Sequence, residues 1–338
     1  MIQPLCAVAS GSGGHIIPCI TFAQTYKTEP AQPLLFIGNN HQLDTTIQHN
    51  CTGISTAITL DLPKVPYRQW WKLPLFAIQA CTAFLKSLVL LYKHKPSVVV
   101  TTGGYLSIPV CFAAYLLRIP IDIFELNAQP GRTTTFLAPF ARSIFICFKE
   151  TQKYLKKQAT LTAYPLRFSA SDKHAEHTEK PTLLVLGGSQ GSAFFNVMLE
   201  SVTPDFLKKI RVIHQTGSAD LHKVQAFYKR HEIDANVFSY HHNLADYYNQ
   251  ASLVICRAGA GSIFETLFFE KPCIIIPLAA ATTTHQQDNA LAALQDHPQL
   301  VTVLFQQKIV RHPSLLQETI QKKLENHQAF VSGSSVRP

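Results

Sequence analysis

The sequence predicts an α/β protein made of two doubly wound, Rossmann-like domains that face each other across a cleft. Three observations support this fold class. The chain has 338 residues, enough for two hydrophobic cores; short apolar runs alternate with helix-length segments; and a glycine-rich loop follows the first apolar run of each half. Open parallel sheets bind ligands beyond the carboxyl ends of their strands, so we expect the two loops to lie on opposite sides of the cleft.

Apolar runs of three to five residues have the length and content of strands in a parallel sheet covered by helices on both faces. In the first half they are Leu5–Ala9, Leu34–Ile37, Ser97–Thr101, Ile121–Phe124 and Ser143–Cys147. In the second half they are Thr182–Leu186, Val212–Gln215, Asn236–Phe238, Leu253–Cys256, Cys273–Ile276 and Leu300–Leu304. The polar stretch 163–180 separates the two series, so we expect domains of residues 1–162 and 163–338. A further hypothesis is that the final helix-like stretch, 317–330, packs back on the first domain.

The composition is that of a globular protein with an anionic partner. Hydrophobic residues make up 46% of the chain and charged residues only 15%, which excludes a disordered nucleic-acid-binding tail. The net charge of +9 favours a nucleic acid, an acidic lipid surface or a phosphorylated substrate, and charge alone does not choose among them. Eight dispersed cysteines without a C-x-x-C pair are typical of reduced thiols in a cytoplasmic protein. No signal peptide is expected, because glycines interrupt the first apolar run.

Two glycine-rich loops, Ser10–His15 and Gly187–Ser192, are candidate anion sites. In each loop, glycine lets backbone N–H groups and the positive end of a helix dipole approach a phosphate. Neither loop has the lysine of a P-loop or the spacing of the dinucleotide fingerprint, so an NAD enzyme or a P-loop NTPase is not expected. The alternative interpretation of either loop alone is a structural turn that binds no ligand. The chain has no Asp-x-Asp pair, and His15 has no neighbour at metal-ligand spacing, so we expect metal-independent chemistry.

A basic, aromatic segment at residues 67–78 predicts contact with an anionic membrane surface. Indole rings favour headgroup depth and cations meet the lipid charge. The residues assigned to this contact are Arg68, Trp70, Trp71, Lys72, Leu75 and Phe76. We expect the apolar stretch that continues to residue 91 to be a core helix. A transmembrane span is not expected, since the uncharged run covers only residues 73–85, short of the roughly 20 residues that a span requires.

Several motifs, in order along the chain, resemble the MurG family of GT-B glycosyltransferases. They are Gly11–His15 with Pro18, Gly103–Ser107 with Pro109, Glu125 and Asn127 with Pro130 and Gly131, Arg167, Gly187–Ser192 with Asn196, Cys256–Ala260 through Glu265, and His285 and Gln286 with Asn289. The family transfers N-acetylglucosamine from UDP-N-acetylglucosamine to lipid I, an undecaprenyl-diphosphate-linked muramyl peptide. The resemblance implies inverting transfer to the muramyl 4-hydroxyl, forming lipid II for peptidoglycan, at the cytoplasmic face of the inner membrane. It implies no cofactor, essential metal or nucleic-acid partner.

The resemblance places the donor site in the second half. Glu265 is expected to accept both ribose hydroxyls, and Arg167 to contact the diphosphate. Helix-start residues stabilise the leaving diphosphate in place of a metal; they are Ser189, Gln190, Gly191, Ala260, Gly261 and Ser262. The family packs uracil at Tyr240, His241 and Leu244, and we assign Gln286 and Asn289 to the sugar hydroxyls. Arg257 is expected to brace its loop, with an ion pair to Glu265 as the alternative.

The acceptor site falls in the first half. His15 is the best candidate for the base that takes the proton of the attacking hydroxyl. The competing hypothesis is that His15 only binds the acceptor diphosphate, while another group or none acts as base. The lipid I site is assigned to Gly13, Gly14, Gly103, Gly104 and Tyr105. Glu125 and Asn127 are expected to orient the acceptor sugar or to position His15.

Four residues depart from the family pattern: Phe124, Leu126, Thr134 and Tyr164 stand where the family has histidine, glutamine, asparagine and asparagine. Each exchange removes a hydrogen-bonding group, so we expect acceptor handling to be changed more than donor binding. Two other functions stay open. One is an isomerase like UDP-N-acetylglucosamine 2-epimerase, and the other is a diverged, non-catalytic protein that binds a nucleotide sugar.

Overall fold

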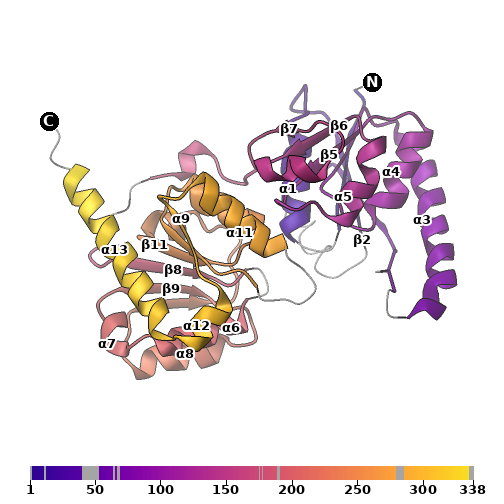
Figure 1. Cartoon of the computed structure of the whole chain (residues 1–338). Coiled ribbons are helices and arrows are strands. Elements are labelled where there is room, and N and C mark those ends of the chain that lie inside the picture. Colours follow the sequence, from indigo (N-terminus) through magenta and orange to yellow (C-terminus); the bar gives the residue numbers. More distant parts are fainter. Residues whose placement is uncertain are drawn as a thin grey trace. The chain divides into compact units, whose positions relative to one another are not determined.

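The computed structural model describes residues 2–10, 13–39, 53–63, 65–66, 69–174, 176, 178–188, 191–278 and 285–334, with side chains up to residue 326. The described chain divides into two compact units, Met1–Arg167 and Phe168–Pro338 (Figure 1). The division falls inside the expected linker. Each unit is a parallel sheet with helices on both faces, so the predicted fold class is confirmed.

The first unit contains, in its described part, a seven-stranded parallel sheet in the order β3-β2-β1-β4-β5-β6-β7. The strands are β1 (Leu5–Val8), β2 (Leu34–Asn39), β3 (Thr56–Leu60), β4 (Val99–Thr101), β5 (Ile121–Glu125), β6 (Ser143–Ile146) and β7 (Thr160–Leu161). The direction of the strand order reverses between β1 and β4. The carboxyl ends of these two strands therefore define the switch point, where doubly wound sheets bind ligands.

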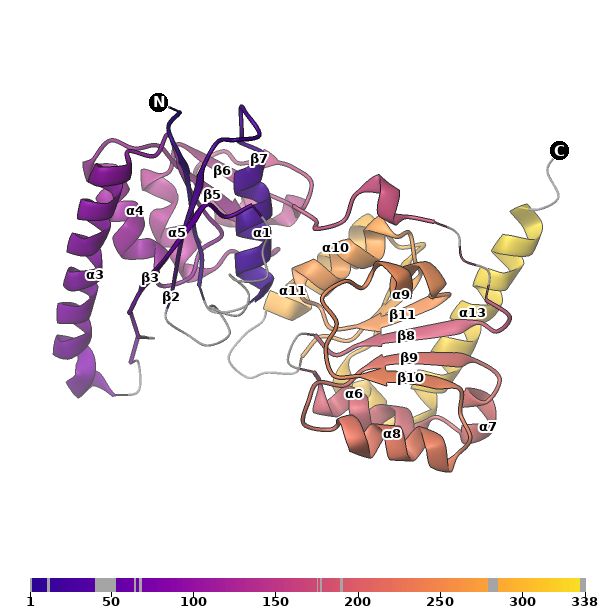
Figure 2. The ribbon, with the colours of Figure 1, turned by 180° about the vertical axis from the view of Figure 1, so that it is seen from behind.

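Helices cover both faces of the first sheet. They are α1 (Gly13–Gln24), α3 (Leu73–His94), α4 (Ser107–Leu116) and α5 (Arg132–Leu137), with 3₁₀ turns η1 (Trp70–Lys72), η2 (Ala138–Phe140) and η3 (Lys149–Tyr154). On one face, Phe22 of α1 stacks on Phe124 of β5 with ring centroids 4.7 Å apart. On the other face, α3 and α4 lie side by side (Figures 1 and 2). Of these two helices, α4 contributes more of the buried core side chains.

The second unit contains a six-stranded parallel sheet in the order β10-β9-β8-β11-β12-β13 among its described residues. The strands are β8 (Thr182–Leu186), β9 (Arg211–Gln215), β10 (Ala235–Phe238), β11 (Leu253–Cys256), β12 (Cys273–Ile275) and β13 (Val301–Val303). The switch point lies between β8 and β11. The glycine loop after β8 and the Arg257–Gly259 loop after β11 are therefore neighbours at one edge of the sheet.

The helices of the second unit are α6 (Ala193–Met198), α7 (Pro204–Leu207), α8 (Leu221–Arg230), α9 (Ala245–Gln250), α10 (Ala260–Phe268), α11 (His285–Asp296), α12 (Gln306–Arg311) and α13 (Ser314–Ser334), with turns η4 (Ala170–Asp172) and η5 (Leu199–Ser201). Figure 2 shows α9, α10 and α11 on one face of this sheet and α6 and α8 on the other. The described side chains of α13 belong to the core of this unit, through Leu316, Ile320 and Leu324. Packing of the helix on the first unit stays a prediction.

All eleven expected strands occur, with ends shifted by a few residues. Two further strands, β3 and β7, were not expected. Both lie at the edges of the first sheet, and their side chains are mostly exposed. An edge strand lacks the continuous buried run by which the other strands were recognised.

Candidate functional site

The two glycine loops of the first unit meet at its switch point. Gly103 and Gly104, which follow β4, have φ values of +93° and +90°, a region that strongly favours glycine. A side chain on Gly104 would place its Cβ 3.0 Å from the Ser10 hydroxyl and 3.1 Å from the Ser10 carbonyl oxygen. Glycine is therefore required for the loop after β4 to approach the loop after β1.

Hydroxyl groups hold the Gly103–Gly104 loop in place. The Gly103 N–H donates to Thr101 Oγ1 at 3.0 Å, and Ser107 Oγ donates to the Gly103 carbonyl at 2.7 Å. Ser107 and Thr101 are fully buried, and their hydroxyls lie 2.6 Å apart. The Ser10 hydroxyl, in contrast, is buried without a hydrogen-bond partner among the described residues.

His15, in the first turn of α1, is fixed to the neighbouring loop. Its Nδ1 lies 3.1 Å from the Thr102 carbonyl oxygen, and Thr102 Oγ1 donates to the His15 carbonyl at 2.9 Å. A carbonyl oxygen only accepts, so Nδ1 carries the hydrogen of this bond. In the neutral ring, Nε2 then has the lone pair, and it has no hydrogen-bond partner among the described residues. This tautomer is the one that a proton acceptor needs.

Glu125 and Asn127 form one structural group. The buried Glu125 carboxylate accepts from the Asn127 N–H at 3.0 Å, from Asn127 Nδ2 at 3.1 Å and from the Gly131 N–H at 3.1 Å. The carboxylate thus shapes the loop between β5 and α5 and orients Asn127. No hydrogen bond joins either residue to His15 in the part of the chain that the structure describes, so orientation of the acceptor sugar is the alternative that stays a prediction.

Tyr105 is anchored by a residue that the sequence reasoning missed. Asn39, at the end of β2, donates through Nδ2 to the Tyr105 hydroxyl at 2.5 Å and to the Leu62 carbonyl at 2.8 Å. Asn39 is buried, which makes these bonds costly to break. A polar residue at the end of an otherwise apolar strand is the sequence signal that could have identified Asn39. Gly13 and Gly14 are the first two residues of α1.

The departures from the family pattern lie inside the fold. Phe124 is fully buried in an aromatic cluster with Phe22, and Leu126, Thr134 and Tyr164 are also buried. The Phe124 ring faces α1 and the core. A changed handling of the acceptor stays a prediction.

In the second unit, the glycine loop is pressed against the neighbouring strand end. Gly191 has φ +76°, and a Cβ there would lie 2.2 Å from the Thr216 carbonyl oxygen, so only glycine fits. Ser189 and Gln190 lie outside the described residues, as does Arg68 of the membrane segment. Ser192 caps α6 by accepting the Phe195 N–H at 3.3 Å.

Arg257 braces this loop, as expected. One terminal nitrogen, Nη2, donates to Ser192 Oγ at 2.7 Å, and Nη1 donates to the Ile276 carbonyl at 3.3 Å. The guanidinium lies 4.4 Å from the centroid of the Phe195 ring, and burial lowers the Arg257 pKa to about 10. The alternative of an ion pair with Glu265 finds no support among the described residues.

The residues after β11 begin α10 and lead to Glu265. Ala260, Gly261 and Ser262 form the first turn, where unpaired N–H groups point out of the helix. Glu265 lies one turn later and accepts from the Tyr248 hydroxyl at 3.2 Å. The predicted ribose residue therefore lies on the same short helix as the predicted phosphate residues.

The predicted uracil residues form the connection between β10 and α9. Leu244 is buried, whereas Tyr240 is 53% exposed and offers its ring to a ligand. His241 packs edge-on against Tyr247, with centroids 5.4 Å apart. The three residues are sequence neighbours at the carboxyl end of the sheet, where a base would be bound.

Gln286 and Asn289 lie in the first half of α11. Gln286 Oε1 accepts the Leu278 N–H at 2.9 Å. Asn289 is buried, and its Nδ2 donates to the Ala258 carbonyl at 3.1 Å, so this amide holds the loop after β11. Contact of either residue with the sugar stays a prediction. The same applies to Arg167, the last residue of the first unit.

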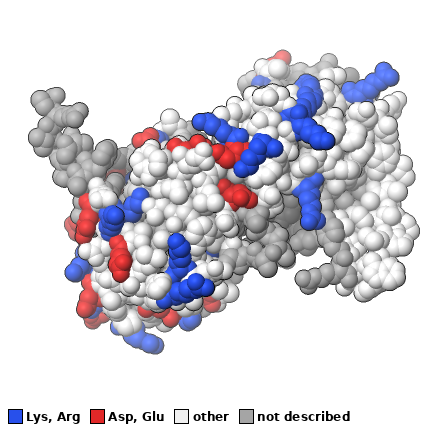
Figure 3. Space-filling model, viewed as in Figure 1, with Lys and Arg blue, Asp and Glu red and all other residues white. Residues whose placement is uncertain are grey.

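The helix α3 is not a core helix, contrary to expectation. Only Ala83, Ser87 and Leu91 are buried along its 22 residues. Its outward stripe carries Leu75, Ile78, Leu85, Val89 and Tyr92, which are 57–68% exposed. Figure 3 shows that the surface over α3 is almost free of charged side chains. Among the described residues, Trp70–His94 is long and apolar enough to span a membrane by length and composition, but its inner side packs on α4 and the core.

The described part of the predicted membrane segment, residues 69–78, is largely exposed. Trp70 and Trp71 are 73% and 60% exposed and lie in η1 directly before α3, whereas Phe76 is partly buried against the core. Lys72 and Leu75 are exposed beside them. Because α3 leads into β4, its first turn lies at the sheet edge that bears the glycine loops.

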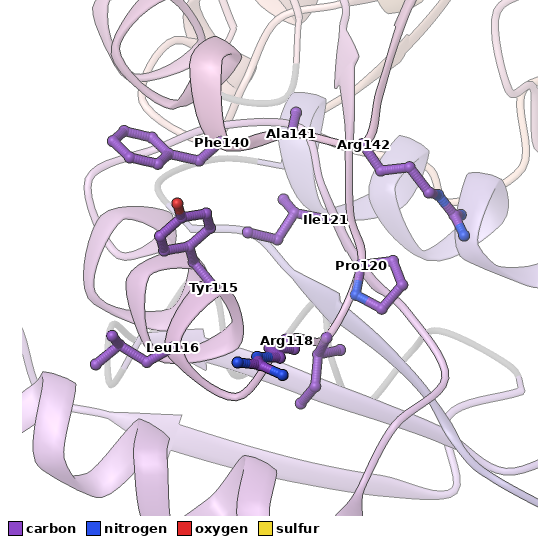
Figure 4. A pocket seen from close by; sticks show the side chains of 9 residues that line it. Tyr115, Leu116, Arg118, Pro120, Ile121, Phe140, Ala141 and Arg142 are labelled. Carbon is purple, nitrogen blue, oxygen red and sulfur yellow. The ribbon is translucent and has the colours of Figure 1, made fainter.

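The far end of this face contains an open pocket of about 520 Å³ (Figure 4). Tyr115 and Leu116 at the end of α4 line it together with Phe140, Arg118 and Arg142. Arg142 is paired with the buried Asp122, whereas the Arg118 guanidinium has no ion pair or hydrogen bond among the described residues. The pocket thus offers the Arg118 cation beside the exposed Tyr115 ring.

The described chain offers neither a metal site nor a reactive thiol pair. No group of three or more His, Cys, Asp or Glu residues there has the arrangement of a metal site. The described cysteines are free thiols, and most are buried. Burial raises the pKa of Cys19 to about 12, so this thiol stays protonated at neutral pH.

The fold and these loops define a glycosyltransferase of two α/β domains. Residues 5–146 match the glycosyltransferase family 28 N-terminal domain, and residues 182–334 match the family 28 C-terminal domain. The chain is 31% identical to the UDP-N-acetylglucosamine–N-acetylmuramyl-(pentapeptide) pyrophosphoryl-undecaprenol N-acetylglucosamine transferase of Trichlorobacter lovleyi, over 96% of this chain and 91% of the relative. The transferase of the same name from Geobacter metallireducens is 34% identical, over 86% and 82%. The chain belongs to this transferase family, known as MurG.

Solved structures agree with this fold. Acinetobacter baumannii MurG has a TM-score of 0.72 at 21% identity and covers 96% of this chain and 93% of its own. A structure described as a UDP-N-acetylglucosamine 2-epimerase from Listeria monocytogenes has a TM-score of 0.64 at 9% identity, over 97% and 91%. Similarity at these identities shows the fold alone, so it does not separate transferase from epimerase; the sequence relatives do.

Proposed function

We propose that this protein transfers N-acetylglucosamine from UDP-N-acetylglucosamine to the muramyl 4-hydroxyl of lipid I and so forms lipid II. The observation that carries the proposal is the pair of switch points. The switch point of the first unit has two glycine loops suited to an anion and places His15 with its Nε2 lone pair there. The switch point of the second unit has a glycine loop, the start of α10 and the Glu265 carboxylate. This division suits one site for a diphosphate-linked acceptor and one for a nucleotide sugar.

His15 acts as the base in this proposal. Its Nδ1 is held by the Thr102 carbonyl, so Nε2 receives the proton as the hydroxyl oxygen bonds to the anomeric carbon. The bond from that carbon to the UDP oxygen breaks, and the charge that develops on UDP is stabilised by N–H groups at the start of α10 and by the loop after β8. Arg257 keeps that loop in place through Ser192. No metal is needed in this scheme.

The test is a turnover assay with the full chain and a soluble, short-chain lipid I analogue. We expect UDP release only when the analogue is present, and a β-linked product. Conversion of UDP-N-acetylglucosamine to its 2-epimer without an acceptor would establish the isomerase instead. UDP binding without any turnover would establish a non-catalytic protein. His15→Gln is expected to lower kcat at least about 100-fold with little change in donor KM, whereas the exposed His222→Gln serves as control.

We further propose that the protein is a peripheral membrane protein that docks through α3 onto the anionic cytoplasmic face of the membrane. The apolar stripe of α3 offers side chains to the lipid, and Trp70 and Trp71 suit the headgroup layer. Lys72 and the Arg118 guanidinium supply positive charge at the two ends of the face. The inner side of α3 stays packed on α4, which favours a helix lying on the membrane over one that crosses it. Sedimentation with phosphatidylglycerol vesicles, but not with neutral vesicles, is the expected result.

A further inference from the structure

Tyr248 lies between the predicted uracil and ribose residues. Its backbone N–H donates to the carbonyl of Leu244 at 2.9 Å, and its hydroxyl lies 3.2 Å from Oε2 of Glu265. The two partners belong to different segments, the connection before α9 and the middle of α10. Tyr248 therefore joins the two parts of the site through hydrogen bonds at opposite ends of one residue.

The burial of Tyr248 favours its bond to Glu265. The side chain is fully buried, so a hydroxyl without a partner would be costly, and a bond to a carboxylate is stronger than one to a neutral acceptor. Its ring stacks on Phe269, with centroids 4.9 Å apart and planes 7° from parallel. The Phe269 N–H in turn donates to the Glu265 carbonyl at 3.1 Å. Tyr248 thus holds the turn of α10 that carries Glu265 from both ends.

A third aromatic side chain extends this cluster. Phe168, which directly follows Arg167, packs edge-on against Phe269 at 5.1 Å and against Tyr248 at 6.2 Å. Phe168 is the first residue of the second unit. The start of this unit, the base segment and the ribose helix are therefore fixed to one another by packing beneath the predicted nucleotide site.

We propose that Tyr248 is a positioning residue for nucleotide recognition, which sets the orientation of the Glu265 carboxylate for the ribose hydroxyls. The inference rests on the proposed function, because it takes a uridine nucleotide as the ligand. A carboxylate has about four acceptor positions, so one bond from Tyr248 fixes its orientation and leaves capacity for a diol. The expected ligand preference is for a ribose that bears both hydroxyls.

The experiment measures dissociation constants of UDP and of 2′,3′-dideoxy-UDP by titration calorimetry with the full chain. Wild type should bind UDP at least ten times more tightly than the dideoxy compound. Tyr248→Phe should reduce this preference about fivefold or more, by weakening UDP binding alone. The ratio of the two constants does not depend on the folded fraction, so it stays informative if the variant is less stable.

The matched control is Tyr228→Phe. Tyr228 is also buried in the second unit, on the sheet face opposite α9 and α10, and its hydroxyl bonds to His214 Nδ1 at 3.0 Å. This variant should keep the wild-type ratio. In a Glu265→Gln background, Tyr248→Phe should have much less additional effect, since the charged partner is gone.

Three results would overturn the inference, and they are distinct. If Tyr248→Phe keeps the full preference for UDP, Tyr248 has only a structural role and the proposed function is unaffected. If wild type binds both compounds equally, the ribose assignment of Glu265 fails together with the inference. If wild type binds neither compound, the proposed function itself fails.

Discussion

Replacing the exposed stripe of α3 by serine should detach the protein from membranes without unfolding it. Ile78, Leu85 and Val89 are 65%, 59% and 68% exposed, so a triple serine variant removes apolar surface that makes few contacts within the protein. Full burial of such a side chain is worth about 1.5–3 kcal/mol. With about two thirds of each side chain available to lipid, the three contribute about 3–6 kcal/mol if fully immersed, and about half of that at an interface. A loss of about 1.5–3 kcal/mol lowers the partition coefficient roughly 12- to 150-fold.

The assay is co-sedimentation with phosphatidylglycerol vesicles over a range of lipid concentrations. Val310→Ser is the matched control, because Val310 is an equally exposed aliphatic residue on α12 of the second unit, at 66%. It should bind vesicles like wild type. Turnover of a water-soluble acceptor analogue should be unchanged in the triple variant, which shows that the site is intact. Vesicle binding within threefold of wild type by a folded triple variant would refute the docking face.

Three further predictions concern stability, each measured by urea unfolding. Gly191→Ala should lower the unfolding free energy by at least about 3 kcal/mol, because its Cβ would lie 2.2 Å from the Thr216 carbonyl oxygen. Gly188→Ala should lower it by only about 1–2 kcal/mol, since Gly188 has φ +86° but no described atom within 4 Å of the added Cβ. Equal losses would contradict the packing argument. Ser10→Ala should raise the unfolding free energy by about 1 kcal/mol by removing a buried hydroxyl that has no partner in the described part of the chain, and a decrease would count against it. Burial lowers the pKa of His214 to about 3, so below about pH 6.5 the unfolded state binds a proton at this side chain that the folded state does not bind. The unfolding free energy should therefore fall by up to about 1.4 kcal/mol per pH unit as the pH drops from 6.5 toward 3. His214→Gln should flatten this slope, and identical slopes would disprove the assignment.

The sheets were predictable because nearly every central strand is buried on both faces and reads as an unbroken apolar run. Thr182–Leu186 is such a strand, with all five residues buried. Thr56–Leu60 is the opposite case, since an edge strand with one buried residue has no such pattern. The glycine loops were predictable for a related reason, because a turn from strand to helix at a switch point leaves a local glycine signature.

The role of α3 was not predictable from composition. Hydropathy reports how apolar a helix is, but not whether a neighbour covers it, and the buried positions Ala83, Ser87 and Leu91 are no more apolar than the exposed ones. Contacts between distant residues were missed for the same reason. The bond from Asn39 to Tyr105 and the bond from Tyr248 to Glu265 depend on tertiary packing, which a single sequence does not display.

The course of α3 has a kinetic consequence. The helix begins at the sheet edge that bears the predicted acceptor loops, so the proposed docking on its outer stripe would keep those loops at the water–lipid boundary. A polyprenol-linked substrate then reaches the loops by lateral diffusion and never leaves the bilayer. Its effective concentration is then a surface density. The reaction rate should therefore depend on the mole fraction of the substrate in the vesicle membrane and not on its total concentration in the assay.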